Sequence, residues 1–513
     1  MATWTAGYVA NIGYTHGFYR ELTPVLLSFL ALTRSYAGPA LDRPLQICEL
    51  GCGQGFSMNL LAAANPHCQF HATDFNPSQI AGAKALAGEA GLSNVHFHDT
   101  AFADFAAEAS LPEAFDVIAL HGIYSWISPE NRAAIVDFIA KKLKVGGLVY
   151  ISYNALPGWA SGMPLRRLFV ERAGSASGPI GPRIEDALAF AGRLKDVNAG
   201  FFRVNPGTGE RLDRIKGQNR NYLAHEYFNR DWTPFYFTDV AEELSAAKLS
   251  FVGSAALLES VDAINLTAEQ QGLLAEIGDV AQRETVKDFI FNQQFRRDVF
   301  VKGPLPLSPR AAQSAWAEQR FALSTRREDV PLTVMGILGE ANLQPEVYGP
   351  LLDGLANGPK TVRDLVSDPD IAALGWARLT QAFTVLVGSG HLQPCLPARD
   401  EAKRAKTTKA FNQAVVARAK DGADLQFLAS PVTGGGVSLD RFQQLFLGAL
   451  WEGKKTPTEW ADAAWQALAA QGQRLVKGGK TLESEAENRA ELTAQAEGFA
   501  EKRLPVLRNL GIA

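Results

Sequence analysis

Residues 45–55 decide the fold and read Leu45-Gln46-Ile47-Cys48-Glu49-Leu50-Gly51-Cys52-Gly53-Gln54-Gly55. The apolar run 45–50 predicts a buried β-strand, and the helical pattern of residues 56–64 begins directly after the three glycines. Glycine lets a backbone turn sharply and approach a ligand closely, while the first turn of a helix offers free N–H donors. This sequence therefore predicts a ligand-binding loop between a strand and a helix.

More strand-like runs alternate with helical patterns as far as residue 160. They cover residues 69–74, 95–98, 115–120 and 148–154. Such alternation is typical of an α/β fold with a doubly wound, mostly parallel sheet. The helix before the last run is expected to begin at Ser128-Pro129 and to end at Gly146-Gly147. We therefore predict a Rossmann-like, ligand-binding domain over residues 1–160.

The rest of the chain reads as further domains that are mainly helical. Residues 161–224 are interpreted as an insertion serving as a lid or a dimerisation segment, because the Gly/Ser/Pro stretch 174–182 interrupts two helical patterns. Residues 225–303 form a middle segment whose strand 249–253 returns to the first sheet and whose end, 268–301, is expected to be helical. Residues 310–400 resemble a winged helix, and residues 401–513 are expected to form a helical C-terminal domain.

Composition excludes several classes of protein. The 513 residues carry 50 Lys and Arg against 54 Asp and Glu, so no overall basic charge favours nucleic acid or an anionic membrane. No apolar run predicts a signal peptide or a membrane span. Four cysteines are too few for a disulfide framework. Cys48-x-x-x-Cys52 could be a metal or redox pair, but no second Cys/His pair stands at zinc spacing, so we predict a cytoplasmic protein without a metal site.

Two acidic residues indicate what the glycine loop binds. Glu49 stands two positions before Gly51, where a carboxylate disfavours a pyrophosphate and favours an ammonium or hydroxyl group. Asp74 ends the second strand, 23 residues after Gly51, where a carboxylate can accept both hydroxyls of a ribose. A nucleoside joined to an amino acid satisfies both residues.

The pattern Glu49-x-Gly51-x-Gly53-x-Gly55, followed by Asp74, resembles class I S-adenosylmethionine methyltransferases. The resemblance implies that the backbone of the glycine loop lies against the methionine part of S-adenosylmethionine, that Glu49 holds its ammonium group, and that Asp74 holds its ribose. It also implies an acidic residue near the adenine, but Ala101 occupies that position and Phe102 is expected to cover the ring. The full set of expected cofactor-binding residues is Tyr14, Glu49, Gly51, Cys52, Gly53, Gly55, Asp74, Phe75, Ala101, Phe102 and His121.

The methyl acceptor is expected at the carboxyl ends of the fourth and fifth strands, where open α/β sheets bind ligands. Two aromatic and polar loops follow these strands, 121–126 and 152–159. The expected catalytic residues are His121, Tyr124, Trp126, Tyr153 and Asn154. Tyr124, Trp126 and Tyr153 could form an electron-rich cage for an amine, and His121 either accepts a proton or satisfies the strand end.

Two aromatic segments outside these loops are also of interest. Tyr14 and His16 precede the first strand and either close over the site as a lid or pad the core. Nine aromatic residues lie between Phe201 and Phe237, which is dense for a solvated loop. We expect some of them to bury an interface and others to line the cleft.

Scattered segments resemble a narrower bacterial family, the methyltransferases with a methyltransferase regulatory domain. They are 14–24, 121–126, 152–159, 225–227, 235–237, 287–297 and 428–432. The family includes rickettsial protein-lysine methyltransferases, so the resemblance implies a protein acceptor and a homodimer as one arrangement. Two other hypotheses stay open: a methyltransferase of a small molecule or natural-product peptide, and a non-catalytic, cofactor-binding regulator that contacts a partner or DNA.

Overall fold

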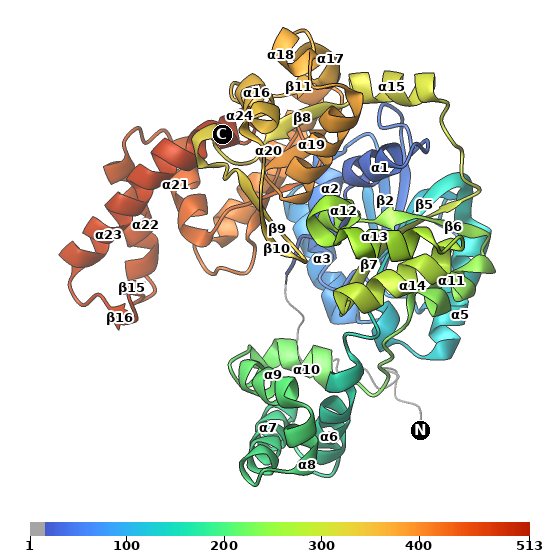
Figure 1. Cartoon of the computed structure of the whole chain (residues 1–513). Coiled ribbons are helices and arrows are strands. Elements are labelled where there is room, and N and C mark those ends of the chain that lie inside the picture. The colour runs from blue at the N-terminus through green and yellow to red at the C-terminus, as the bar shows by residue number, and fades with distance from the viewer. Residues whose placement is uncertain (1–15) are drawn as a thin grey trace.

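The computed structural model describes residues 16–513, and a seven-stranded sheet organises the part of the chain from Gln46 to Lys302 (Figure 1). The strand order is β3-β2-β1-β4-β5-β7-β6. The bounds are β1 Gln46–Leu50, β2 Gln69–Thr73, β3 Val95–His98, β4 Phe115–Leu120, β5 Leu143–Asn154, β6 Leu249–Ser254 and β7 Phe295–Lys302. Strands β1 to β5 pair in parallel, which confirms the predicted Rossmann-like α/β fold.

Strand β7 is antiparallel and lies between β5 and β6. The return of residues 249–253 to the first sheet is confirmed, but the expectation of a helix through residue 301 is wrong. Helix α13 (Ala268–Ala275) is followed by α14 (Val280–Phe291), which is capped by Asn292 with a left-handed φ of 49°, and the chain then enters β7. The sequence of β7 does not have the pattern of a buried strand, because the charged residue Arg296 occupies a buried position in it.

Helices cover both faces of the sheet and place two apolar cores around it. Helices α1 (Pro24–Thr33), α2 (Phe56–Ala64) and α3 (Pro77–Glu89) belong to one core. Helices α4 (Phe102–Phe105), α5 (Pro129–Lys142) and α11 (Phe237–Ser245) belong to the other. The predicted helix end at Gly146-Gly147 is wrong, because α5 ends at Lys142 and both glycines lie within β5.

The segment after β5 forms a helical lobe with its own apolar core. Its helices are α6 (Met163–Gly174), α7 (Ile180–Asp196), α8 (Gly200–Val204), α9 (Pro206–Lys216) and α10 (Arg220–Tyr227). Figure 1 shows this lobe projecting from the body of the molecule below the sheet. Short helices η4 (Leu257–Ser260) and α12 (Asp262–Asn265) follow β6.

Residues 309–395 contain short helices around a small sheet. The helices are α15 (Pro309–Glu318), η5 (Arg327–Asp329), α16 (Pro345–Leu355), α17 (Val362–Leu365), α18 (Pro369–Ala372) and α19 (Trp376–Gly388). The strands are β8 (Arg320–Leu323), β9 (Thr333–Gly336), β10 (Gly339–Asn342), β11 (Lys360–Thr361) and β12 (Leu392–Cys395), with β11-β8-β12 as one sheet. The predicted wing is not confirmed, because β12 pairs with β8 and leads directly to helix α20 (Glu401–Arg418).

The C-terminal residues pack back onto the first domain. Their elements after α20 are β13 (Phe427–Ala429), β14 (Gly436–Ser438), α21 (Arg441–Trp451), α22 (Pro457–Ala469), β15 (Val476–Lys477), β16 (Lys480–Thr481), α23 (Glu485–Gly498), a π-helical turn (Phe499–Arg503) and α24 (Leu504–Asn509). Helix α20 lies against α2, the helix that follows the glycine loop, and the rings of Phe411 and Phe56 meet there at 6.1 Å. None of the helices in residues 16–513 is both long and apolar enough to cross a bilayer.

Candidate active site

The glycine loop between β1 and α2 depends on backbone conformations that favour glycine. Gly51, Gly53 and Gly55 have φ values of 78°, 52° and 64°, all left-handed. A Cβ atom built on Gly51 would lie 2.6 Å from Ile123 Cγ2, so a side chain is excluded there. At Gly53 the nearest atom to a built Cβ is 3.9 Å away, which leaves open space above the loop. The loop thus exposes its backbone to a ligand.

Asp74 fixes the loop from the end of β2. Its Oδ2 accepts a hydrogen bond from Gly53 N at 2.9 Å, and its Oδ1 accepts one from Asn76 N at 2.9 Å. Burial raises the pKa of Asp74, and these two backbone donors oppose that rise. The carboxylate therefore ties the two loops of the cofactor site together and lines the cavity between them.

Glu49 is a carboxyl group buried near the end of β1. Only 3% of its surface is exposed, and its Oε2 has no hydrogen-bond partner among the described residues. Burial, with the nearby Asp74 as a smaller cause, raises the pKa of Glu49 to about 8. A buried acceptor of this kind fits an ammonium group, as expected for the amino-acid part of S-adenosylmethionine.

One cavity of about 620 Å³ joins these groups. It is lined by most of the cofactor-binding residues expected from the sequence: Glu49, Gly51, Cys52, Gly53, Gly55, Asp74, Phe75, Ala101, Phe102 and His121. Trp126 and Asn154, expected to be catalytic, also line it. Tyr14 lies outside the described residues, and His16 is not part of the cavity wall. The structure therefore brings the two predicted halves of the site together.

His121 is held as a neutral side chain. Its Nδ1 lies 2.9 Å from the hydroxyl of Tyr150, and its ring stacks on Tyr19 with a centroid distance of 3.6 Å. Burial lowers the pKa of His121 to about 3, so it does not take up a proton near neutral pH. Of the two roles expected for this histidine, the geometry favours the structural one.

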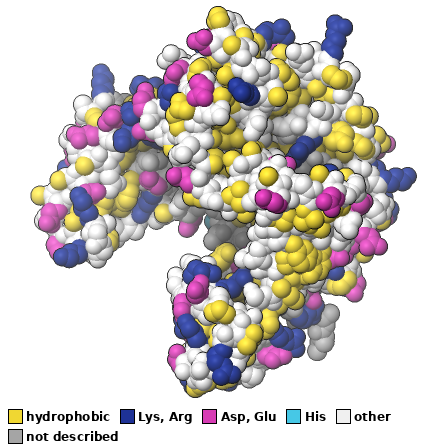
Figure 2. Space-filling model, viewed as in Figure 1, with side chains coloured by type: hydrophobic (Ala, Val, Ile, Leu, Met, Phe, Trp, Pro, Cys, Tyr) yellow, Lys and Arg dark blue, Asp and Glu magenta, His cyan; other side chains and the backbone are white. Residues whose placement is uncertain are grey.

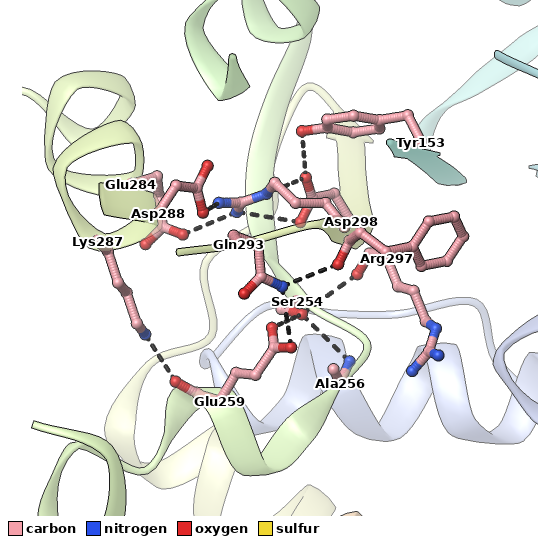
Figure 3. Close-up of polar contacts among 12 residues, drawn as sticks. Tyr153, Ser254, Ala256, Glu259, Glu284, Lys287, Asp288, Gln293, Arg297 and Asp298 are labelled. Atoms are coloured by element: carbon pink, nitrogen blue, oxygen red, sulfur yellow. Dashed lines mark hydrogen bonds and ion pairs between the residues drawn. The ribbon is translucent and has the colours of Figure 1, made fainter. Parts of the chain in front are cut away.

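Tyr124 and Tyr153 do not form the predicted cage, because both are fully buried outside the cavity. The hydroxyl of Tyr124 donates to Glu243 on α11. The hydroxyl of Tyr153 donates to Asp298 Oδ2 at 2.7 Å, within the polar cluster between β5, β7 and α14 in Figure 3. In that cluster Arg296 forms ion pairs with Asp298, Asp288 and Glu284. Both tyrosines therefore support the sheet rather than the acceptor.

Asn154 and Trp126 are the predicted acceptor-side residues that do reach the cavity. Asn154 ends β5 and is 3% exposed, and its Nδ2 lacks a hydrogen-bond partner among the described residues. Trp126 Nε1 is likewise buried without a partner in that part of the chain. Two unpaired donors beside one cavity indicate groups that a bound molecule would satisfy.

The outer wall of the cavity comes partly from the aromatic segment 201–237, some of whose residues were expected to line the cleft. Trp159, Arg211, Tyr222, His225, Glu226, Tyr227 and Asp231, from the helical lobe and its flanks, line it together with Tyr19. The guanidinium of Arg211 lies 3.8 Å from the centroid of the Trp159 ring. Figure 2 shows the lobe standing away from the body, with a hollow beside it. The signals in the sequence were the loop 152–159, which contains Trp159, the density of aromatic residues from 201 to 237 and the segment 225–227; Arg211 and Asp231 gave no such signal.

Comparison with known proteins agrees with this geometry. A family model described as a methyltransferase domain matches residues 41–161, and one described as a predicted methyltransferase regulatory domain matches residues 219–302. An uncharacterized protein of Synechocystis, sll1526, is 45% identical over 511 residues and covers 100% of both chains. Another uncharacterized protein, RP789 of Rickettsia prowazekii, is 26% identical over 295 residues, which are 56% of this chain and 52% of RP789.

The solved structures add a likeness of fold over nearly the whole chain. The structure of PKMT2 from Rickettsia typhi in complex with AdoHcy has a TM-score of 0.68 at 18% identity, covering 95% of this chain and 98% of PKMT2. The buried Glu49, the Asp74 carboxylate and the open glycine loop fit S-adenosylmethionine as the cofactor. The chain belongs to the S-adenosylmethionine-dependent methyltransferases that carry a methyltransferase regulatory domain.

Proposed function

We propose that this enzyme transfers methyl groups to the side-chain nitrogens of lysines in a protein acceptor. The observation that carries this proposal is the composition of the outer cavity wall. Glu226 brings a carboxyl group there, beside the aromatic rings of Tyr222 and Tyr227. Asp231 lines the same wall but is ion-paired with Arg230, and the ring of Trp159 is covered by the guanidinium of Arg211. Acidic groups and aromatic faces together suit an ammonium or methylammonium group.

Glu226 is the group that we propose as the proton acceptor. S-adenosylmethionine supplies a methyl group whose bond to sulfur breaks as the acceptor nitrogen takes it. A lysine ammonium has no free electron pair, so it must lose a proton first. Burial raises the pKa of Glu226 to about 7, close to neutral pH. Its carboxylate can therefore take the proton and release it to solvent between transfers.

Other residues would orient the amine. Asn154 Nδ2 and Trp126 Nε1 are buried donors without partners in the described chain, and both border the same cavity. Neutral His121 keeps a second positive charge away from the incoming ammonium, because its pKa is held at about 3. Catalysis then depends on alignment and desolvation rather than on a strong base.

The position of the wall supports a macromolecular acceptor. Tyr222 is 39% exposed on α10, so the acidic and aromatic wall extends from the cavity to the surface of the helical lobe. Figure 2 shows a hollow beside this lobe. A lysine is long enough to place its nitrogen in a cavity while its backbone stays outside, whereas a small metabolite would need a more enclosed site.

The test is incubation of the purified enzyme with radiolabelled S-adenosylmethionine and a lysate of its own organism. We expect label in discrete protein bands, released as methyl-lysine on hydrolysis, and loss of that label in Glu226→Gln. Asp74→Ala serves as a control that fails at the cofactor instead. Label found only in the solvent-extracted fraction would replace this proposal with a small-molecule or peptide methyltransferase. No label despite measurable cofactor binding would favour the regulator.

A further inference from the structure

A short N-terminal segment runs between the cofactor cavity and the C-terminal part of the chain. Gly17 and Tyr19 line the cavity, and the Tyr19 ring stacks on His121. Phe18, between them, is 8% exposed and belongs to the large apolar core instead. The backbone therefore presents alternate residues to two different environments.

Ser57 attaches the cavity side of this segment to the glycine loop. Its hydroxyl donates to the carbonyl oxygen of Gly17 at 3.0 Å and accepts from Tyr19 N at 3.4 Å. Ser57 lies in the first turn of α2, two residues after Gly55, and also lines the cavity. A displacement of residues 17–19 would therefore disturb the hydrogen bonds of Ser57 at the cofactor site.

The other side of the segment rests on the hairpin of β13 and β14. Phe18 lies against Gly436, and its ring is 5.4 Å from that of Phe427. A Cβ atom built on Gly436 would lie 2.7 Å from Phe18 Cδ1 and 3.0 Å from Phe18 Cγ. The φ of Gly436 is not left-handed, so space for the Phe18 ring, rather than backbone conformation, accounts for glycine there.

The hairpin is itself fixed to the methyltransferase core. Asn65, directly after α2, donates from Nδ2 to the carbonyl oxygen of Gly434 at 2.8 Å. Ser430 Oγ donates to the carbonyl oxygen of Leu510 at 2.8 Å, near the C-terminus. These bonds give a structural role to the segment 428–432 and the three glycines 434–436, which the site does not use. The hairpin therefore provides an anchored surface against which Phe18 packs.

We propose that Phe18 and Gly436 are positioning residues for the methyltransferase. The hairpin of β13 and β14 seats Phe18 and thereby holds Tyr19 and Gly17 over the cofactor. A segment more than 400 residues from the N-terminus thus sets cofactor affinity. The proposal concerns the affinity for the cofactor and not the identity of the acceptor, so its test is independent of the proposed lysine methylation.

The test is Gly436→Ala, measured by calorimetric titration with S-adenosylmethionine. The added methyl forces the Phe18 ring to move, and Tyr19 and Gly17 with it. Only the part of this cost that differs between the free and the bound state changes affinity, and about 1.4 kcal/mol of it corresponds to a tenfold change. We therefore expect the dissociation constant to rise about tenfold. The matched control is Gly498→Ala in the same C-terminal part, where a built Cβ meets nothing within 4 Å, and its affinity should not change.

Two further variants separate positioning from folding. Phe18→Leu combined with Gly436→Ala makes room for the methyl, and we expect it to recover most of the lost affinity. Should Gly436→Ala fail to fold, Phe427→Leu removes the other ring that packs against Phe18. This variant should also weaken cofactor binding. A lower melting temperature with an unchanged dissociation constant in each folded variant would overturn the proposal, as would a double variant no better than Gly436→Ala.

Discussion

We predict that Glu49, as the proposed partner of the cofactor's ammonium group, makes cofactor affinity depend on pH. Without a ligand its pKa is about 8, so at pH 7 the group holds a proton. An ammonium group bound against it favours the carboxylate, so cofactor binding expels that proton. Affinity must therefore rise as the pH rises towards 8. Below pH 7 the amino group of the cofactor stays protonated, so this window isolates Glu49.

The magnitude follows from the value of that pKa. At pH 7 about 0.9 of the Glu49 side chains are protonated, so binding should release about 0.9 proton. Between pH 6 and pH 7 the fraction of the ready carboxylate form grows about ninefold, and the association constant should grow by the same factor. The Glu49→Gln variant should bind more weakly at pH 7 and lose this dependence.

The assay is calorimetric titration in buffers of different ionisation enthalpy. The slope of the binding enthalpy against that ionisation enthalpy gives the number of protons released. S-adenosylhomocysteine serves as a second ligand because it has the same amino-acid part without the sulfonium charge. An association constant that stays flat between pH 6 and pH 7, with no proton released, would refute the assignment of Glu49 to the ammonium group.

Three further outcomes are expected. Asp74→Ala removes the acceptor for Gly53 N and Asn76 N, and should weaken S-adenosylmethionine binding by about 2–4 kcal/mol in the same titration. For the wild type, turnover should rise with pH through about 7 as Glu226 ionises, whereas Glu226→Gln should be slow at every pH with unchanged cofactor affinity. Tyr153→Phe leaves Asp298 without one donor and should cost about 1–3 kcal/mol of unfolding free energy in urea melts, with methyl transfer retained.

The sequence predicts the first domain well because its signals are local. Glycines with left-handed φ must stand at the turn, and the strand-like runs 95–98 and 115–120 coincide with β3 and β4. Strand β7 could not be predicted in this way. A buried arginine such as Arg296 is tolerated only when carboxylates compensate its charge, and here three carboxylates do so. Two of those partners, Glu284 and Asp288, come from α14, so the compensation is tertiary and no local pattern shows it.

The acceptor side shows a different kind of error. Side chains alternate between the two faces of a strand, so Tyr153 and Asn154 cannot both point into one cleft. The structure places Asn154 in the cavity wall and Tyr153 on the other face, against Asp298. This mistake was avoidable from the sequence. The position of Glu226 in the cavity wall could not be predicted, because it depends on how a separate helical lobe folds back towards the sheet.

The placement of β7 between β5 and β6 has a consequence for synthesis of the chain on the ribosome. Strand β5 is complete at Asn154, yet the neighbour on its open side begins at Phe295, so 140 residues separate them. At a translation rate of roughly 5–20 residues per second, this side of β5 stays unpaired for on the order of 7–30 seconds.

During that time the strand presents unpaired backbone groups along an apolar, β-prone sequence, which is the kind of edge that recruits other chains. Strand β6, which emerges earlier, cannot cover it, because β6 pairs only with β7 within the described sheet. Yield in cells should therefore be sensitive to translation speed between residues 155 and 294, and a chaperone that binds extended apolar segments has its natural target at β5.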